Sequence, residues 1–410
     1  MKLTRTIKDV NTYIAGINEL SDFGIENITV EHRSNNPKRD YLFVNKKQCK
    51  HIPVSGTHMI NMCKKLAKLV NNNLANTTSI GAKVLVVGFA ETATAIGNIV
   101  ADHLCCDTYV MQTTREEVPG SKQLISFEEE HSHATTQKLL TYEDTDTDKF
   151  LSQFEYVLFV EDEISTGNTI LNFIDEFEKV KSGMRYGVAS ICNWQSIENQ
   201  NKFIKRKIDT FALLRGELKD QNAKMFEGGD SVVYLDNKVN KYSRMREGNS
   251  CFLYKPSSKV LGEDLFREER LGHKANRDFS KLFELVDASM DKQCDIKSVR
   301  VVGTEEFMYI PIKIAEYIEN KYRVDVICHS TTRSPIDVMK SKCYGCADAI
   351  TSKNVVPSVY EDDRVTHLYN LDEVTDLVLF VTDGELDTSL AMGYYEMFKD
   401  KTRIVTAYSL

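Results

Sequence analysis

The stretch from residue 157 to residue 169 constrains the fold more than any other part of the chain. It begins with the apolar run Val-Leu-Phe-Val, continues with two acids, Glu161 and Asp162, and passes into a turn rich in hydroxyl groups. A short apolar run predicts a buried strand, and the polar turn after it predicts the start of a helix. The sequence therefore predicts a strand–loop–helix unit with carboxylates where the strand ends, at Val160.

The turn after the two acids has the chemistry of an anion site. Its residues are Ser165, Thr166, Gly167, Asn168 and Thr169. Backbone N–H groups at a helix start attract anions, glycine lets a phosphate approach closely, and hydroxyls add donors. Carboxylates beside the loop would repel an anion unless they bind another group, and the paired hydroxyls of a ribose suit them. We therefore expect a ribose 5-phosphate site here, with an ordinary capped helix as the alternative.

This stretch resembles the signature of type I phosphoribosyltransferases, which is a hydrophobic strand, two acids and then Thr-Gly-Gly/Asn-Thr. The resemblance implies a parallel α/β sheet with flanking helices and phosphoribosyl pyrophosphate as a substrate. It also implies that magnesium binds through the substrate, with Glu161 and Asp162 nearby. A Rossmann dinucleotide site is not expected, because no G-x-G-x-x-G follows the first strand of the sheet.

Short apolar runs alternate with helical segments, which is typical of a parallel sheet. In the first half, strands are predicted at 84–87, 107–111, 156–160 and 186–192, and helices at 91–104 and 168–180. In the second half, strands are predicted at 298–302, 324–328, 377–381 and 403–407, and a helix at 306–320. We therefore expect two α/β domains.

The resemblance also implies a pyrophosphate-binding loop after an earlier strand. The candidates are Phe89, Ala90, Glu91 and Thr92, which follow the run Val-Leu-Val-Val-Gly and precede a helix. The basic residue that some family members have in this loop is missing. We therefore expect pyrophosphate contacts to come from backbone N–H groups and from residues elsewhere, with a capped helix start as the alternative.

The span 112–138 is longer than a usual connection of about 4–6 residues, which often marks a lid over an active site. Arg115 is expected to neutralise the departing pyrophosphate. His131 and His133 are candidates to donate a hydrogen bond to it or to move a proton, and the acids at 128–130 would raise their pKa. A solvated loop is the alternative for both histidines.

The second half of the chain echoes the first. Residues 84–92 match 299–307, residues 111–119 match 329–337, and residues 157–163 match 378–385. These anchors in the same order indicate a duplicated fold unit. The match aligns Glu161 and Asp162 with Thr382 and Asp383, and Thr166 and Gly167 with Asp387 and Thr388. Because an acid and the glycine are lost there, we expect a degenerate domain that does not bind phosphoribosyl pyrophosphate.

The motif Thr-Arg333-Ser334-Pro in this second half resembles a two-part family in which a phosphoribosyltransferase precedes a "TRSP" domain. The resemblance implies a place in tellurium-resistance and stress-response gene clusters, with partner enzymes from the same cluster and a ribosylated, nucleoside-like product. Arg333 and Ser334 are expected to bind an acidic or phosphorylated group of the acceptor. The alternative is that Arg333 braces its own loop.

We expect three segments along the chain. Residues 1–215 form the phosphoribosyltransferase domain, 216–275 a polar connecting arm, and 276–410 the TRSP domain. Lys50 and His51 are candidates for an N-terminal hood over the acceptor, with a solvated basic turn as the alternative.

Composition limits the partners. The formal net charge is −8, so the chain lacks the basic field that non-specific nucleic-acid binding needs. No apolar run approaches the length of a membrane span, and no signal-peptide pattern is present, so we expect a cytoplasmic protein. The ten cysteines are then expected to be reduced thiols. Cys343 and Cys346 form a single C-x-x-C pair, for which a metal or redox role is the alternative.

These inferences combine into one expected function. The chain would use phosphoribosyl pyrophosphate and magnesium to ribosylate a nucleobase-like acceptor, and would act as a homodimer. One alternative is a non-catalytic sensor of phosphoribosyl pyrophosphate or nucleotides, and another is a phosphoribosyl hydrolase or phosphorylase-like enzyme. A further alternative is that the second half is an interaction module for partner enzymes.

Overall fold

The structure is a computed structural model of the chain. It describes residues 3–7, 10–19, 23–33, 41–77, 79, 81–127, 137–218, 233–234, 251–256, 265–290, 295–338, 345–353, 365–382, 398 and 402–409. Contacts group the chain into two compact units. Unit 1 comprises Met1–Glu26, Ile60–Lys224 and Arg267–Arg277, and unit 2 comprises Asn27–Met59, Met225–Phe266 and Asp278–Leu410.

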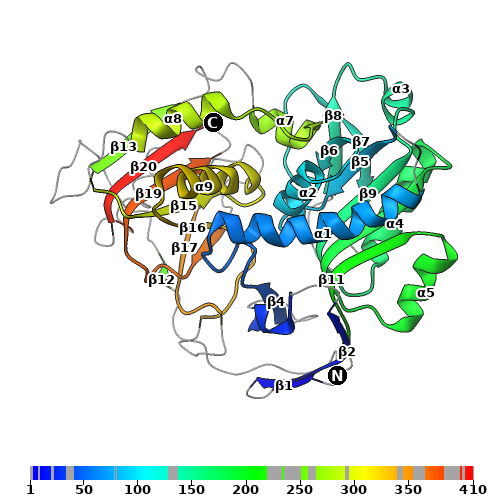
Figure 1. The fold of residues 1–410 in the computed structure, drawn as a ribbon, viewed down its shortest axis with the longest axis horizontal. Coiled ribbons are helices and arrows are strands. Elements are labelled where there is room, and N and C mark those ends of the chain that lie inside the picture. Colours follow the sequence, from blue (N-terminus) through cyan, green and yellow to red (C-terminus); the bar gives the residue numbers. More distant parts are fainter. Residues whose placement is uncertain are drawn as a thin grey trace. The chain divides into compact units, whose positions relative to one another are not determined.

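Unit 1 contains an eight-stranded sheet in the order β1-β2-β11-β10-β9-β5-β6-β14 (Figure 1). Its parallel strands are β5 (Lys83–Gly88), β6 (Asp107–Gln112), β9 (Tyr156–Ile164), β10 (Arg185–Asn193) and β11 (Asp209–Leu218). Antiparallel edges are formed by β1 (Leu3–Ile7) and β2 (Val10–Glu19) on one side and β14 (His273–Lys274) on the other. The predicted runs become central strands because their residues, such as Val84–Gly88, are buried on both faces.

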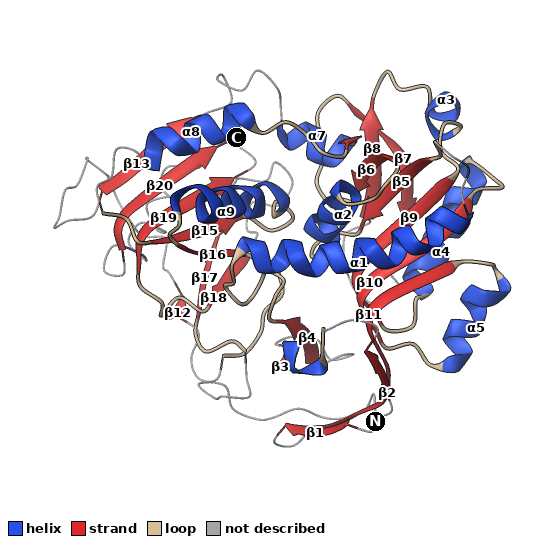
Figure 2. Cartoon of the chain, in the orientation of Figure 1, coloured by secondary structure: helices blue, strands red, loops and turns tan. Residues whose placement is uncertain are grey.

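Helices pack against the strands of unit 1 (Figure 2). They are α1 (Gly56–Thr77, of which Ile60 onward belongs to this unit), α2 (Ala93–Asp102), α3 (Thr147–Leu151), α4 (Asn168–Val180) and α5 (Ile197–Lys205). Helix α4 buries Phe173 and Phe177 one turn apart, and the ring of Phe173 meets that of Phe159 on β9 edge-on at 5.5 Å. This packing fixes α4 against the strand that precedes it. An antiparallel hairpin, β7 (Ser121–Phe127) and β8 (Gln137–Tyr142), also belongs to this unit.

Unit 2 contains a five-stranded parallel sheet in the order β13-β20-β19-β15-β16. These strands are β13 (Cys251–Pro256), β15 (Ser298–Gly303), β16 (Asp325–Ser330), β19 (Thr375–Thr382) and β20 (Thr402–Ser409). Helices α8 (Ser280–Met290) and α9 (Tyr309–Tyr322) belong to the same unit. Smaller sheets pair β3 (Ile28–His32) with β4 (Tyr41–Asn45), and β17 (Ala349–Lys353) with β12 (Val233–Tyr234) and β18 (Val365–Tyr369).

The two units repeat one topology, which confirms the predicted relation between the halves. The order β6-β5-β9-β10 in unit 1 matches β16-β15-β19-β20 in unit 2, and each unit inserts an antiparallel hairpin before its third matching strand. The register agrees as well, since Val87 pairs with Phe159 and Val302 pairs with Phe380. The fifth strand differs, because β11 follows β10 along the chain whereas β13 precedes β15.

The compact units divide the chain differently from the predicted segments. Residues Asn27–Met59, expected to form a hood on the first domain, group with unit 2. The expected connecting arm is divided: 216–224 group with unit 1, and Met225–Phe266 group with unit 2, where β13 pairs with β20. Arg267–Arg277, of which 267–275 were expected in the arm and 276–277 in the TRSP domain, group with unit 1, where β14 pairs with β6. This last segment includes most of α7 (Leu265–Leu271). Among the described residues, no helix is both long and apolar enough to cross a membrane.

Candidate functional site

In the sheet of unit 1, the direction in which the chain adds strands reverses between β5 and β9. From β5 the chain passes through α2 to β6 on one side, whereas β9 lies on the other side and leads through α4 to β10. In parallel sheets a ligand crevice forms at such a point, beyond the carboxyl ends of the strands. The loops at this point are 89–92 and 165–167, which the sequence singled out separately.

The acids lie within β9 and not after it. The strand ends at Ile164 instead of the predicted Val160, because its pairing with β10 continues to Asn193 opposite Ile164. Glu161 and Asp162 are partly exposed at the carboxyl end of the sheet. The Oδ1 atom of Asp162 accepts a 2.8 Å hydrogen bond from the N–H of Glu163.

The predicted phosphate loop leads directly into α4. Gly167 caps this helix with φ = 82°, a left-handed conformation that other residues adopt at a cost. A Cβ atom on Gly167 would lie 2.6 Å from Nε2 of Gln195, so the site also lacks space for a side chain. The N–H of Asn168 donates to Oγ1 of Thr166 at 3.3 Å, while Ser165 is exposed and Thr169 is partly exposed. The loop thus combines hydroxyl groups with the start of a helix, where backbone N–H groups favour anions.

A polar segment after β10 supports this loop, and the sequence-based prediction missed it. Nε2 of Gln195 donates to the carbonyl oxygen of Thr166 at 2.9 Å, and its Oε1 accepts from Nδ2 of Asn193 at 3.1 Å. The N–H of Trp194 donates to the carbonyl oxygen of Ile164 at 2.7 Å. The signal was present in the sequence, because polar residues directly follow a buried strand that neighbours β9.

The loop after β5 is attached to β9 and β6. The N–H of Phe89 donates to the carbonyl oxygen of Val160 at 3.1 Å, and the N–H of Ala90 donates to Oγ1 of Thr113 at 2.8 Å. Phe89 is buried, and its ring meets that of Phe173 edge-on at 5.4 Å. The side chain of Phe89 therefore belongs to the core, and only its backbone can contribute to the surface of the loop. The Ala90–Glu91 peptide bond is cis, and Glu91 and Thr92 are partly exposed.

Thr113 and Gln137 fix the shape of this loop. The N–H of Thr113 donates to the carbonyl oxygen of Gly88 at 2.9 Å, and its hydroxyl donates to Oε1 of Gln137 at 2.5 Å. Nε2 of Gln137 in turn donates to the carbonyl oxygen of Ala90 at 3.3 Å. Both Thr113 and Gln137 are buried, so their hydrogen bonds are shielded from water.

Arg115 lies just past β6, at the same edge of the sheet as the two loops. It is partly exposed and sits in a turn in which Oγ1 of Thr114 accepts a 3.1 Å hydrogen bond from the N–H of Glu116. The other expected lid residues, His131 and His133, lie outside the described residues. Of the three lid candidates, the described part of the chain therefore contains Arg115, which lies at the same edge of the sheet as the acids and both loops.

The predicted second-domain residues have partners of their own in unit 2. Nε of Arg333 forms an ion pair with Oε1 of Glu305, and the N–H of Ser334 donates to Oγ1 of Thr332 at 3.1 Å. The contact of Arg333 matches the alternative in which it braces its own loop. Lys50 is buried and donates to the carbonyl oxygen of Glu305 at 2.6 Å.

Other predicted features of this unit are less informative about chemistry. His51 is buried and lies in unit 2. Cys346 is buried with a free thiol, and burial raises its pKa well above the usual value, which makes it a poor nucleophile. Its predicted companion Cys343 lies outside the described residues, as do Asp383, Asp387 and Thr388.

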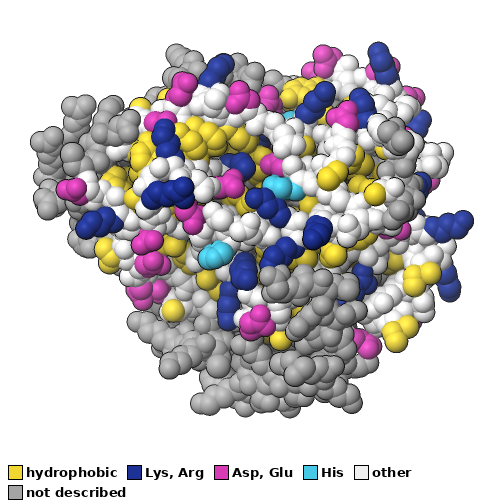
Figure 3. All heavy atoms as spheres, in the orientation of Figure 1, with side chains coloured by type: hydrophobic (Ala, Val, Ile, Leu, Met, Phe, Trp, Pro, Cys, Tyr) yellow, Lys and Arg dark blue, Asp and Glu magenta, His cyan; other side chains and the backbone are white. Residues whose placement is uncertain are grey.

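Charged side chains of both signs lie on the described surface of the protein. Figure 3 shows Lys and Arg side chains interspersed with Asp and Glu over the face in view. Within the described part of the chain, no group of three or more His, Cys, Asp or Glu side chains is arranged to hold a metal ion. Glu161 and Asp162 are hard oxygen donors of the kind that Mg²⁺ accepts in small number when a substrate supplies the rest.

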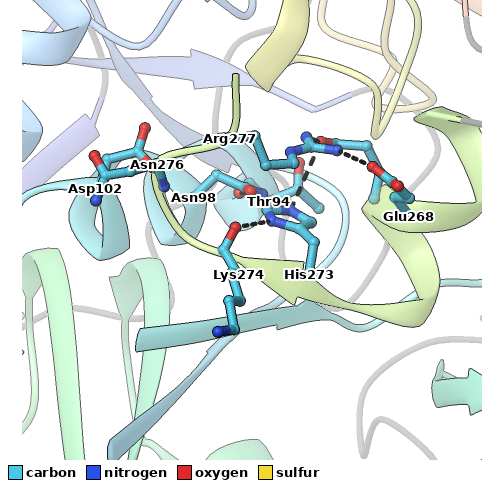
Figure 4. A network of polar contacts seen from close by, with 9 residues as sticks. Thr94, Asn98, Asp102, Glu268, His273, Lys274, Asn276 and Arg277 are labelled. Carbon is cyan, nitrogen blue, oxygen red and sulfur yellow. Dashed lines mark hydrogen bonds and ion pairs between the residues drawn. The ribbon is translucent and has the colours of Figure 1, made fainter. Parts of the chain in front are cut away.

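A polar network of the segment 267–277 lies beside α2, the helix that follows the loop 89–92 (Figure 4). Within this segment Arg277 pairs with Glu269 and, at 3.2 Å, with Glu268 of α7. An exposed 2.8 Å hydrogen bond from the N–H of Asn276 to Oδ1 of Asp102 connects the segment to the carboxyl end of α2.

Comparisons with known proteins agree with this geometry. Residues 28–217 match a family described as phosphoribosyl transferase, and residues 269–398 match a TRSP domain that lies C-terminal to such a domain. No curated protein matches the chain.

Solved structures that match part of the chain include two adenine phosphoribosyltransferases. The one from Rhodothermus marinus is 16% identical, covering 46% of this chain and 94% of its own, with a TM-score of 0.31. The one from Trypanosoma brucei, in complex with AMP, pyrophosphate and ribose-5-phosphate, is 13% identical, covering 57% and 96%, with a TM-score of 0.33. Orotate phosphoribosyltransferase from Mycobacterium tuberculosis is 16% identical, covering 47% and 91%, with a TM-score of 0.27.

Proposed function

The protein is a phosphoribosyltransferase with a TRSP domain at residues 269–398, and we propose that it transfers ribose 5-phosphate from phosphoribosyl pyrophosphate to a nucleobase-like acceptor. One observation carries the proposal. Two helix-opening loops, 89–92 and 165–167, follow the neighbouring strands β5 and β9 at the switch point of the sheet, and Glu161 and Asp162 lie near the end of β9, just before the second loop. Two anion loops flanking a pair of acids suit a sugar with a phosphate at one end and a pyrophosphate at the other.

The loop after β9 binds the 5-phosphate in this proposal. The first turn of α4 supplies backbone N–H groups and the positive end of the helix dipole. Thr166 and Thr169 supply hydroxyl donors, and Gly167 gives the loop the left-handed turn from which α4 begins. Ser165, which is exposed, and Asn168 complete the set of donors.

Glu161 and Asp162 bind the ribose hydroxyls, and the loop after β5 binds the pyrophosphate. Carboxylates accept hydrogen bonds from vicinal hydroxyls, which gives these acids a role that does not conflict with the neighbouring anion loop. The backbone of residues 90–92 faces the pyrophosphate, and the guanidinium of Arg115 neutralises charge on it as it leaves. Mg²⁺ fits this site when the substrate carries it, and it would then neutralise charge on the pyrophosphate.

The chemistry is a displacement at the anomeric carbon. The bond from this carbon to the pyrophosphate oxygen breaks, the electron pair leaves with pyrophosphate, and a nitrogen of the acceptor forms the new bond. The chain contributes mainly by positioning the groups and by stabilising the developing charges. Closure of the span 112–138 excludes water, and His131 and His133 are our candidates to donate a hydrogen bond or move a proton there.

Several finer proposals rest on the resemblance. We propose a cytoplasmic homodimer that works with partner enzymes encoded in the same stress-response or tellurium-resistance cluster. We also keep the boundaries 1–215, 216–275 and 276–410 as proposed functional segments, with residues 276–410 as a degenerate TRSP domain.

The test is pyrophosphate release from phosphoribosyl pyrophosphate in the presence of candidate nucleobases, with and without Mg²⁺. Asp162→Asn and Glu161→Gln are each expected to lower kcat/KM by about 100-fold, because each loses a charged acceptor for the ribose. Glu176→Gln, an exposed acid on α4, is the matched control and should leave the rate unchanged. Release that occurs without an acceptor would indicate a hydrolase, whereas tight binding without release under any acceptor would identify a sensor.

A further inference from the structure

The loop after β5 in unit 1 has a specific anchor. The N–H of Thr113 donates to the carbonyl oxygen of Gly88 at 2.9 Å, and Oγ1 of Thr113 accepts from the N–H of Ala90 at 2.8 Å. Thr113, which lies just past the neighbouring strand β6, therefore fixes the loop at Gly88 and at Ala90.

The loop after β15 in unit 2 has the same anchor. The N–H of Thr331 donates to the carbonyl oxygen of Gly303 at 3.1 Å, and Oγ1 of Thr331 accepts from the N–H of Glu305 at 3.0 Å. Position 305 in unit 2 therefore corresponds to position 90 in unit 1, where the residue is alanine.

The turn that follows is also shared. The hydroxyl of Thr332 accepts a 3.1 Å hydrogen bond from the N–H of Ser334, which places Arg333 in the middle of a turn. Unit 1 has the same turn around Arg115, with the same 3.1 Å bond between the flanking residues. The two arginines thus occupy equivalent positions beside equivalent loops.

What differs is the side chain at the loop. Glu305 adopts a left-handed backbone conformation, with φ = 45°, and its carboxylate pairs with Nε of Arg333. The side chains of this pair are 8% and 18% exposed, so the contact is largely shielded from water. Lys50, a second cation, is 2% exposed and donates to the carbonyl oxygen of the same glutamate. Unit 2 therefore places a carboxylate of its own between the loop and the arginine.

We infer that the Glu305 carboxylate is a built-in anion that fills the anion site of the second unit's loop. The site would otherwise take a phosphate or a diphosphate, the class of ligand that we propose for the equivalent loop of unit 1. Only the comparison with unit 1 rests on the proposed function, since the ion pair and its anchors belong to unit 2 itself. In this proposal the loop of unit 1 can bind pyrophosphate, whereas the carboxylate of Glu305 occupies the equivalent site in unit 2.

Removing the carboxylate exposes the cations to an external anion. Glu305→Ala removes the carboxylate that pairs with Arg333 in a largely shielded position, which is unfavourable. A ligand that binds only the folded form raises stability by an amount that grows with its concentration over Kd. Added anions should therefore stabilise Glu305→Ala more than they stabilise the original protein.

The experiment uses the full chain and inorganic pyrophosphate as the probe. Calorimetry should give one pyrophosphate per chain for the original protein and two for Glu305→Ala. In thermal unfolding, pyrophosphate and acetate should each raise the Tm of Glu305→Ala by several degrees more than that of the original protein. Acetate is informative because it replaces the carboxylate that was removed.

Two variants make the result specific. The double variant Glu305→Ala/Arg333→Met should lose the extra site and the extra stabilisation, because the cation is gone. Glu305→Gln keeps the volume of the side chain and removes its charge, so it gives the same comparison if the alanine variant does not fold. The inference is overturned if the Glu305 variants show the stoichiometry and anion response of the original protein. One site in Glu305→Ala and none in the original protein would support this inference and contradict the proposed role of the first loop.

Discussion

Nε2 of Gln195 donates a 2.9 Å hydrogen bond to the carbonyl oxygen of Thr166 and so connects the end of β10 to the loop that opens α4. Gln195 is buried, and its Oε1 atom accepts a 3.1 Å hydrogen bond from Nδ2 of Asn193. The shape of the candidate phosphate loop therefore depends on a side chain that follows a different strand.

Replacing Gln195 should weaken phosphate binding. Gln195→Leu leaves the partly buried carbonyl of Thr166 without this donor, which costs about 1 kcal/mol, and we expect about a tenfold loss of affinity for ribose 5-phosphate by calorimetry. Gln195→Glu should lose more, because a carboxylate cannot donate to Thr166 and repels the phosphate. Gln200→Leu, which removes an amide donating to the backbone of Gln195, is the control. Unchanged affinity in Gln195→Leu would show that the loop holds its shape without this bond.

Gly167→Ala should damage the same loop for two reasons that a control can separate. The residue has φ = 82°, and a Cβ atom there would meet Gln195 and Phe203 at 2.6 Å. Gly183→Ala has a similar φ of 78° but nothing within 4 Å of the new atom. We expect Gly183→Ala to cost about 1 kcal/mol of stability from backbone strain alone. Gly167→Ala should cost more and should also weaken ribose 5-phosphate binding, which Gly183→Ala should not affect.

The ion pair between Arg277 and Glu269 should contribute strongly to stability. The side chains are 10% and 1% exposed, so removing the cation leaves a buried charge. Arg277→Met is expected to lower the free energy of unfolding by about 3 kcal/mol in denaturant titrations. Lys179→Met removes an exposed pair with Glu176, whose side chains are 67% and 39% exposed, and should change stability by less than about 0.5 kcal/mol. Equal effects of the two variants would contradict this account.

Glu31 should make stability depend on pH near neutrality. Burial raises the pKa of its carboxyl from 4.5 to about 7, although hydrogen bonds from Thr29 and from the N–H of Gly345 oppose this rise. The protonated form is favoured in the folded state, so its stabilising effect is full below pH 4.5 and is lost as pH rises through about 7. Glu31→Gln stays neutral, and its carbonyl still accepts from Gly345. The Tm of the original protein should therefore fall relative to that of Glu31→Gln as the pH rises from 4.5 to about 7, and parallel pH profiles would contradict the prediction.

Much of the architecture could be predicted because it depends on local patterns. The apolar runs at 84–87 and 186–192 became central strands, and α4 covers the predicted residues 168–180. Burial on both faces gives a parallel strand a continuous apolar sequence, which is visible without knowing its neighbours. The glycine at position 167 was likewise recognisable, since a phosphate loop needs an uncovered backbone.

Predictions that involved pairs of distant residues were less complete. Arg333 was recognised as a functional candidate, but its partner Glu305 was not, because the contact joins two loops after different strands. The support from Gln195 was missed for the same reason. The assignment of residues 27–59 to the second unit depends on contacts such as those of Lys50, which no local pattern reveals.

The sequence by itself determined which segments become strands and helices, where the anion loop lies, and that the two halves share one pattern. Periodic burial and turn chemistry are encoded over a few residues, so they can be recognised locally. Only the tertiary structure decided that β5 and β9 are neighbours, so that the loops after them lie at the same edge of the sheet. Strand order and side-chain pairing arise from packing between segments far apart in the chain, such as the packing that pairs Glu305 with Arg333 in unit 2.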